Sequence, residues 1–141
     1  MTVKSQHTLI FILISFGLIC IIIEKTRNLV VDVPSGTTFD AKQSVFPTKV
    51  LHSFALHNPN LYPVALSIPI VGCACTTASV STDTIPPFGS ATVNVKITPD
   101  DPGEISAGVC ARVEHNGKQT DTWLFVKGTS VKSEKHVARK S

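Results

Sequence analysis

Charged residues are scarce in this chain, and its net positive charge is confined to one end. Only 16% of the 141 residues are Asp, Glu, Lys or Arg, and the net charge is +3. Residues 131–141 hold four Lys or Arg against one Glu, which already gives +3, so the remainder sums to zero. Nucleic-acid binding needs a basic face on the fold itself, and we expect no nucleic-acid partner. The tail at 132–141 is predicted to be basic, flexible and solvated, with lipid headgroup contact as the alternative.

The patterns by which enzymes and metal proteins are usually recognised are also missing. The chain has no Gly-rich phosphate loop, no nucleophile elbow, no Cys-x-x-Cys and no His-x-x-x-His. We therefore predict no catalysis, no cofactor and no small-molecule substrate. Asn58-Pro59-Asn60 is predicted to be a turn, and His57 beside it a turn residue rather than a base. His52 is predicted to pack at the edge of the core or to cap a polar contact.

Helical periodicity is absent after residue 23, and short segments of alternating character take its place. Turns rich in Pro and Gly separate these segments, and Asn116-Gly117 is a strong two-residue hairpin signal. Strands are predicted at 29–33 (an edge), 49–57, 64–70, 91–98, 105–114 and 120–127, with a connection at 37–47. Six or seven short strands within about 100 residues predict an all-β fold, an immunoglobulin-like antiparallel β-sandwich.

The alternation predicts which side chains enter the core. In the segment 64–70, Val64, Leu66, Ile68 and Ile70 are expected to face inward, and the same alternation runs through 91–98 and 105–114. Pro69 cannot donate a hydrogen bond to a neighbouring strand, so it should mark an edge or a bulge.

The amino-terminal part contains an uncharged apolar run, Leu9–Ile23. A helix of this length is about 22 Å long, short of the ~30 Å hydrocarbon core, but flanking residues can lengthen it and Lys4 and Lys25 can reach the interfaces. We predict one N-terminal transmembrane helix that anchors the protein. The predicted order is a short tail at 1–8, the anchor at 9–23, a stem at 24–28 and the sandwich at 29–131.

Two alternatives to an uncleaved anchor are a cleaved signal peptide and a lipidated Cys20. No small-x-small cleavage site follows Ile23, and Leu18-Ile19 precede Cys20, so both are disfavoured. The flanking charges nearly balance, and they do not decide the orientation. We expect a single-pass membrane protein with an extracytoplasmic domain, periplasmic or at the cell surface.

Three cysteines lie in the predicted domain: Cys73, Cys75 and Cys110. They allow three pairings, each leaving one cysteine over. A Cys73–Cys75 bond would close a small ring, a bond from Cys110 would join two strands, and buried free thiols are a third possibility. Two thiolates one residue apart also suit a soft ion such as Cu(I). Arg112 lies two residues from Cys110 and is the cation that could activate that thiol.

Trp123 and Phe125 lie on one face of the last predicted strand, opposite Leu124 and Val126. Burial in the core of a second sheet is the preferred interpretation, and an exposed contact patch for a partner is the alternative. These two aromatics and the strand edge near Pro69 are the candidate contacts for a partner.

Several motifs, in order, resemble one known family. HSFALHNPN is followed by YPVALSIPIVGCACT, then IPPFGSATVNVKI and LFVKG. Over about Leu29–Val131 the chain resembles the domain of unknown function 1573 family, bacterial immunoglobulin-like sandwiches related to Hydin-type and major-sperm-protein-like domains. The resemblance implies the fold and an envelope location. The chain departs from the family pattern at two positions. Gly72 stands before the first cysteine where the family usually has Ser, and Ala74 stands between the two cysteines where the family usually has Gly.

These observations predict a membrane-anchored extracytoplasmic domain that binds or supports another envelope protein without catalysis. The alternative is a thiol-redox or Cu(I)-handling module centred on Cys73 and Cys75.

Overall fold

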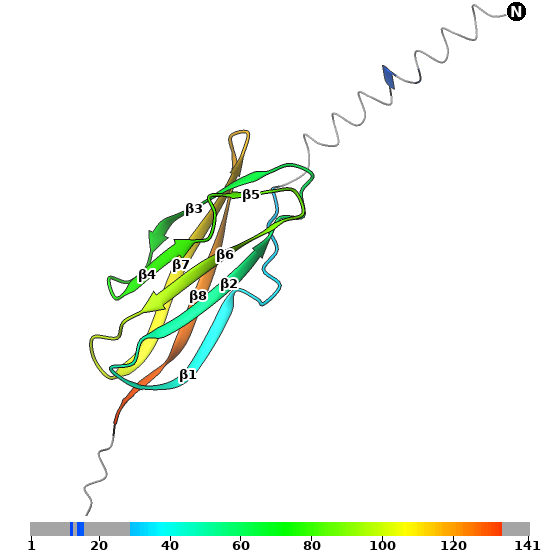
Figure 1. The fold of residues 1–141 in the computed structure, drawn as a ribbon. Coiled ribbons are helices and arrows are strands. Elements are labelled where there is room, and N and C mark those ends of the chain that lie inside the picture. Colours follow the sequence, from blue (N-terminus) through cyan, green and yellow to red (C-terminus); the bar gives the residue numbers. More distant parts are fainter. Residues whose placement is uncertain (1–11, 13, 16–28, 134–141) are drawn as a thin grey trace, which may run out of the picture.

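A computed structural model of the chain describes residue 12, residues 14–15 and residues 29–133. In the domain, eight strands form two sheets packed face to face (Figure 1). One sheet has the strand order β1-β8-β7-β3-β5, and the other has the order β2-β6-β4. This confirms the predicted all-β sandwich. The strands are β1 (Thr38–Phe46), β2 (Val50–His57), β3 (Val64–Val71), β4 (Thr76–Val80), β5 (Thr84–Ile85), β6 (Ser90–Ile97), β7 (Gly103–His115) and β8 (Lys118–Lys132).

The predicted anchor at 9–23 lies outside the described residues, apart from positions 12, 14 and 15. Among the residues that are described, no helix combines the length and apolar character needed to cross a membrane. Cys20, the stem at 24–28 and residues 134–141 of the basic tail also lie outside them. The anchor therefore stays a prediction.

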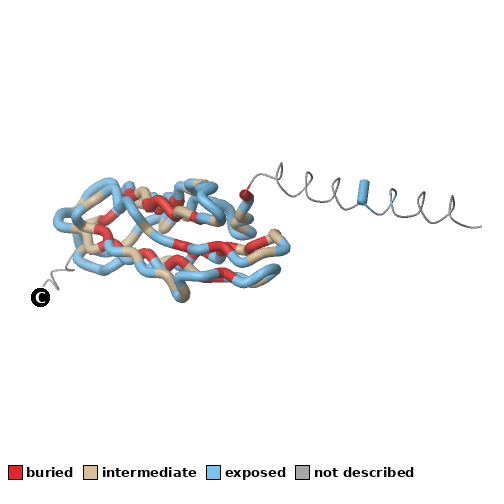
Figure 2. The backbone as a smooth tube through the Cα atoms, turned by 90° about the horizontal axis from the view of Figure 1, so that it is seen from above, coloured by how far each residue is buried: buried red, intermediate tan, exposed pale blue. Residues whose placement is uncertain are grey.

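The core lies between the two sheets and follows the predicted alternation. Every second residue of β6 is buried, and so is every second residue of β7 from Ile105 to Val113. Buried positions recur along the strands of both sheets (Figure 2). The hairpin between β7 and β8 is also confirmed, because Asn116 and Gly117 both have positive φ and His115 pairs with Lys118.

The beginning of the domain differs from the prediction. Residues 29–33 form only an isolated bridge from Asp32 to His57, and the predicted connection at 37–47 contains β1. The alternation of β1 was hidden by a bulge between Asp40 and Gln43. Partly buried positions fall at 39 and 41 and then at 44 and 46, so the alternation shifts by one residue across the bulge.

The last strand is longer than predicted, and its pairing is mixed. β8 continues through Gly128 to Lys132 because β1 pairs along its second half. That pairing is parallel, so the prediction of an entirely antiparallel sandwich is wrong at this edge. The remaining strand pairs are antiparallel.

His52 connects β1 to β2 through ring contacts. Its ring stacks on Phe39 with centroids 3.6 Å apart and meets Phe54 edge-on at 4.6 Å. Burial lowers the pKa of His52. The prediction that this histidine packs at the edge of the core is confirmed.

Candidate functional site

Trp123 and Phe125 lie on the outer face of the five-stranded sheet. Their side chains are 42% and 38% exposed, and their ring centroids are 6.3 Å apart with an interplanar angle of 19°. The preference for burying them was wrong, because Leu124 and Val126 take the inward positions of β8. A Cβ at Gly108 would lie 3.2 Å from the Phe125 ring and 3.6 Å from the Trp123 ring, so the glycine lets both rings pack against the sheet.

This apolar surface continues across β7 to β3. Cys110 pairs with Trp123 on one side and with Ile70 on the other, so the three residues form one row across the sheet. Ile70 is exposed, although it was predicted to face inward. The bulge between Ser67 and Ile70 explains the error, because one extra residue reverses the faces that follow it. Pro69 thus lies at a bulge, as predicted. We call Ile70, Gly108, Cys110, Trp123 and Phe125 the outer patch.

A fixed ion pair borders the outer patch. The Arg112 guanidinium donates from Nε and Nη2 to the two Asp121 carboxylate oxygens, at 2.7 and 2.8 Å. This hydrogen bonding lowers the pKa of Asp121 and raises that of Arg112. An apolar centre beside a bidentate ion pair resembles the core and rim of a protein–protein interface.

Cys110 is a buried free cysteine at the centre of the outer patch. Burial raises the pKa of its thiol, and the neighbouring Asp121 raises it further. Arg112 acts in the opposite direction but is engaged by Asp121. Arg112 therefore does not activate this thiol, which has the character of an inert core residue.

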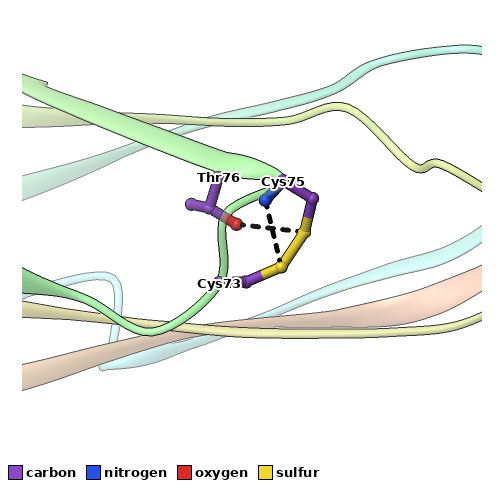
Figure 3. Close-up of a disulfide and its surroundings, with 3 residues drawn as sticks. All are labelled: Cys73, Cys75 and Thr76. Carbon is purple, nitrogen blue, oxygen red and sulfur yellow. Dashed lines mark hydrogen bonds between the residues drawn. A yellow bond between two sulfur atoms is a disulfide. The ribbon is translucent and has the colours of Figure 1, made fainter.

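Cys73 and Cys75 are joined by a disulfide, which selects one of the pairings left open by the sequence (Figure 3). The pair lies in the loop between β3 and β4, with the two Cα atoms 5.2 Å apart. The Cys75 amide donates to Cys73 Sγ at 3.2 Å, and Cys75 Sγ lies 3.7 Å from the Thr76 hydroxyl. A cavity of about 310 Å³ beside the disulfide is also lined by Asp100, Asp101 and Glu104.

The disulfide leaves neither sulfur as a free thiolate, so a soft metal could bind there only after reduction. Within the described part of the chain, no group of three or more His, Cys, Asp or Glu is placed to hold a metal ion. The thiol-redox or Cu(I) alternative at Cys73 and Cys75 stays a prediction.

Thiol labelling should separate the three cysteines. We expect Cys73 and Cys75 to be labelled by a thiol reagent only after reduction, and Cys110 only after unfolding, because its thiol is buried and protonated. Peptide mapping of the folded chain, then of the reduced chain, then of the denatured chain checks this. Labelling of Cys110 in the folded, unreduced chain would contradict it.

Asn58, which the sequence places only in a turn, is a buried polar residue with several hydrogen-bond partners. Its side chain is fully buried, and Nδ2 donates to the carbonyls of Tyr62, Ile85 and Pro86 at 2.9 to 3.1 Å. Its Oδ1 accepts from the amide and the side chain of Asn60 at 3.0 and 2.8 Å. Asn58 therefore joins the β2–β3 loop to the turn after β5. Its position in the family-like motif was the only signal in the sequence.

The two packed sheets and their strand order define an immunoglobulin-like β-sandwich, and solved structures support this class. One relative by fold is a protein of unknown function from Porphyromonas gingivalis W83, with 18% identity and a TM-score of 0.60 over 71% of this chain and 46% of that one. Another is the ASH/PapD-like domain 7 of human CEP192, with 12% identity and a TM-score of 0.60 over 76% and 89%. The VesB protease of Vibrio cholerae matches with 14% identity and a TM-score of 0.58 over 77% and 33%.

At the level of sequence, residues 34–130 match the family described as protein of unknown function (DUF1573), and the chain belongs to that family. No curated protein sequence matches it significantly. The chain spans less than half of the Porphyromonas gingivalis protein and most of the CEP192 domain. At these identities, the structural similarities establish the fold alone.

Proposed function

We propose that the chain is a non-catalytic binding domain, held at the extracytoplasmic side of a membrane by residues 9–23, that contacts another envelope protein. The main support is the outer patch, where two exposed aromatic rings lie side by side on a rigid sheet. Trp and other large aromatic side chains are enriched in interface centres and carry much of the binding energy there. A β-sandwich is suited to a binding or structural role, which is consistent with this proposal.

The two rings of the outer patch are held against the sheet before a partner binds. The rings are fixed by Gly108 and by strand pairing, so few rotamers are lost when a partner binds. The Arg112–Asp121 pair at its border supplies polar groups that can orient the partner.

A double variant tests this proposal. Trp123→Ser with Phe125→Ser is expected to abolish crosslinking between a photoreactive residue at position 67, which borders the outer patch, and the partner in intact cells. Because each ring is more than half buried against the sheet, the unfolding free energy should fall by about 2–3 kcal/mol, and circular dichroism should show that the double variant stays folded. Leu51→Ser, an exposed change on the other sheet, is the matched control and should leave the crosslink intact. A crosslink that persists in the folded double variant would exclude the outer patch.

A further inference from the structure

Three large apolar side chains project from one end of the sandwich. Val30, Leu61 and Phe88 are 45%, 62% and 61% exposed. They belong to three separate segments: the one before β1, the loop between β2 and β3, and the turn between β5 and β6. These segments lie at the end where residue 29 enters the fold, whereas β8 finishes at the opposite end (Figure 1). We call these three residues the apolar end.

Hydrogen bonds hold the three segments of the apolar end together. The Asn60 side chain donates to the Val30 carbonyl at 2.8 Å. The Asn58 amide donates to the Gly89 carbonyl at 2.9 Å, one residue from Phe88. The Thr120 hydroxyl, on β8, donates to the Leu29 carbonyl at 2.9 Å. The apolar end is therefore a fixed surface of the domain and does not depend on one projecting loop.

Phe88 is the most informative of the three residues. Its φ is +56°, in the left-handed region that is costly for a bulky side chain. Its ring is also mostly exposed, so burial within the domain does not offset that cost. A residue that is unfavourable in both respects points to a contact outside the domain.

The length of the connecting chain identifies that contact. Only residues 24–28 separate the predicted membrane span at 9–23 from Leu29. Five residues reach at most about 18 Å when fully extended. The polar headgroup zone extends ~5–8 Å beyond the hydrocarbon core on each side. With 9–23 across the membrane, the apolar end is therefore held within reach of the lipid surface.

We propose that the apolar end inserts into the headgroup region of the same bilayer that holds residues 9–23. This inference rests on the membrane anchoring in the proposed function. Val30, Leu61 and Phe88 act as a second, interfacial contact that fixes how the sandwich stands on the membrane. The occupant of the surface is lipid, because the anchor brings lipid to this end of the domain.

Depth-dependent fluorescence quenching tests the proposal in the full chain reconstituted into vesicles with brominated phosphatidylcholine. Trp123 is the sole tryptophan, so Trp123→Phe with Phe88→Trp moves the probe to the apolar end. Emission from position 88 is expected to fall by about half or more, because interfacial apolar side chains sit ~5–10 Å into the headgroup and acyl boundary. The native chain, with its probe in the outer patch, is the matched control and should be unquenched.

A third chain, Trp123→Phe with Phe16→Trp, separates failure of this inference from failure of the anchor. Quenching at position 16 without quenching at position 88 would overturn the inference and retain the anchor. No quenching at position 16 would overturn both. A blue shift of the emission from position 88 without quenching would mean that protein, not lipid, covers the apolar end. Equal quenching at positions 88 and 123 would mean that the domain lies on its side. Either result would also overturn the proposal.

Discussion

Asn58→Ala is expected to lower the unfolding free energy of the domain by about 4 kcal/mol, a large effect for one side chain. The carbonyls of Tyr62 and Ile85 would lose this donor and Asn60 would lose its acceptor, whereas the Pro86 carbonyl would keep its hydrogen bond from the Gly89 amide at 2.9 Å. Buried carbonyls without a partner each cost ~1–3 kcal/mol, and the missing amide would also leave a void. For a domain of this size, the melting temperature should fall by roughly 15–30 °C. Denaturation followed by Trp123 fluorescence measures the loss.

Asn94→Ala is the matched control for that experiment. Asn94 is exposed on β6 and accepts one side-chain hydrogen bond, from Ser53 at 2.7 Å. Its loss is expected to change the unfolding free energy by no more than about 0.5 kcal/mol. If Asn58→Ala were as mild as Asn94→Ala, Asn58 would not hold the β2–β3 loop and the turn after β5 together.

Phe54→Ala is expected to cost about 4 kcal/mol, because Phe54 is the largest fully buried side chain of the core. The same substitution at Phe88 should be nearly neutral or slightly stabilising. It would remove an exposed ring from a residue with positive φ. Urea denaturation of both variants, followed by Trp123 fluorescence, gives the two values.

The contrast between the two phenylalanines carries information beyond stability. A loss at Phe88 comparable to that at Phe54 would show that its ring packs within the domain, which would remove the reason to seek an outside contact. A neutral Phe88→Ala is the result expected if the ring makes its contact outside the domain. The vesicle experiment then tests that explanation directly.

Much of the fold follows from local sequence pattern. Alternation along 91–97 and 105–113 identified the two central strands and their buried faces, and Asn116-Gly117 identified the hairpin that joins β7 to β8. These predictions succeeded because each depended on regular backbone geometry over a short segment. The number and spacing of the strands predicted the sandwich, and the family resemblance supported it.

Two of the errors share one physical cause, an irregularity that shifts the alternation. The bulge in β1 concealed that strand, and the bulge at Pro69 moved Ile70 from the predicted core to the outer patch. The alternation also left open which face of β8 is inward, so Trp123 and Phe125 were assigned to the core. Only the packing of Leu124 and Val126 against the opposite sheet decides that face. The role of Asn58 depends on partners up to 28 residues away, which no local pattern reveals.

The position of β8 between β1 and β7 has a consequence for biosynthesis. β1 is the first strand of the domain to leave the ribosome, and its neighbour in the sheet is the last. The β2-β6-β4 sheet is complete once residue 97 has been made, whereas β1 waits for residues 125–132. Such distant pairing slows folding and leaves a strand edge unpaired in the meantime. During synthesis, the edge of β1 therefore stays unpaired and prone to aggregation until the last strand, β8, has been translated.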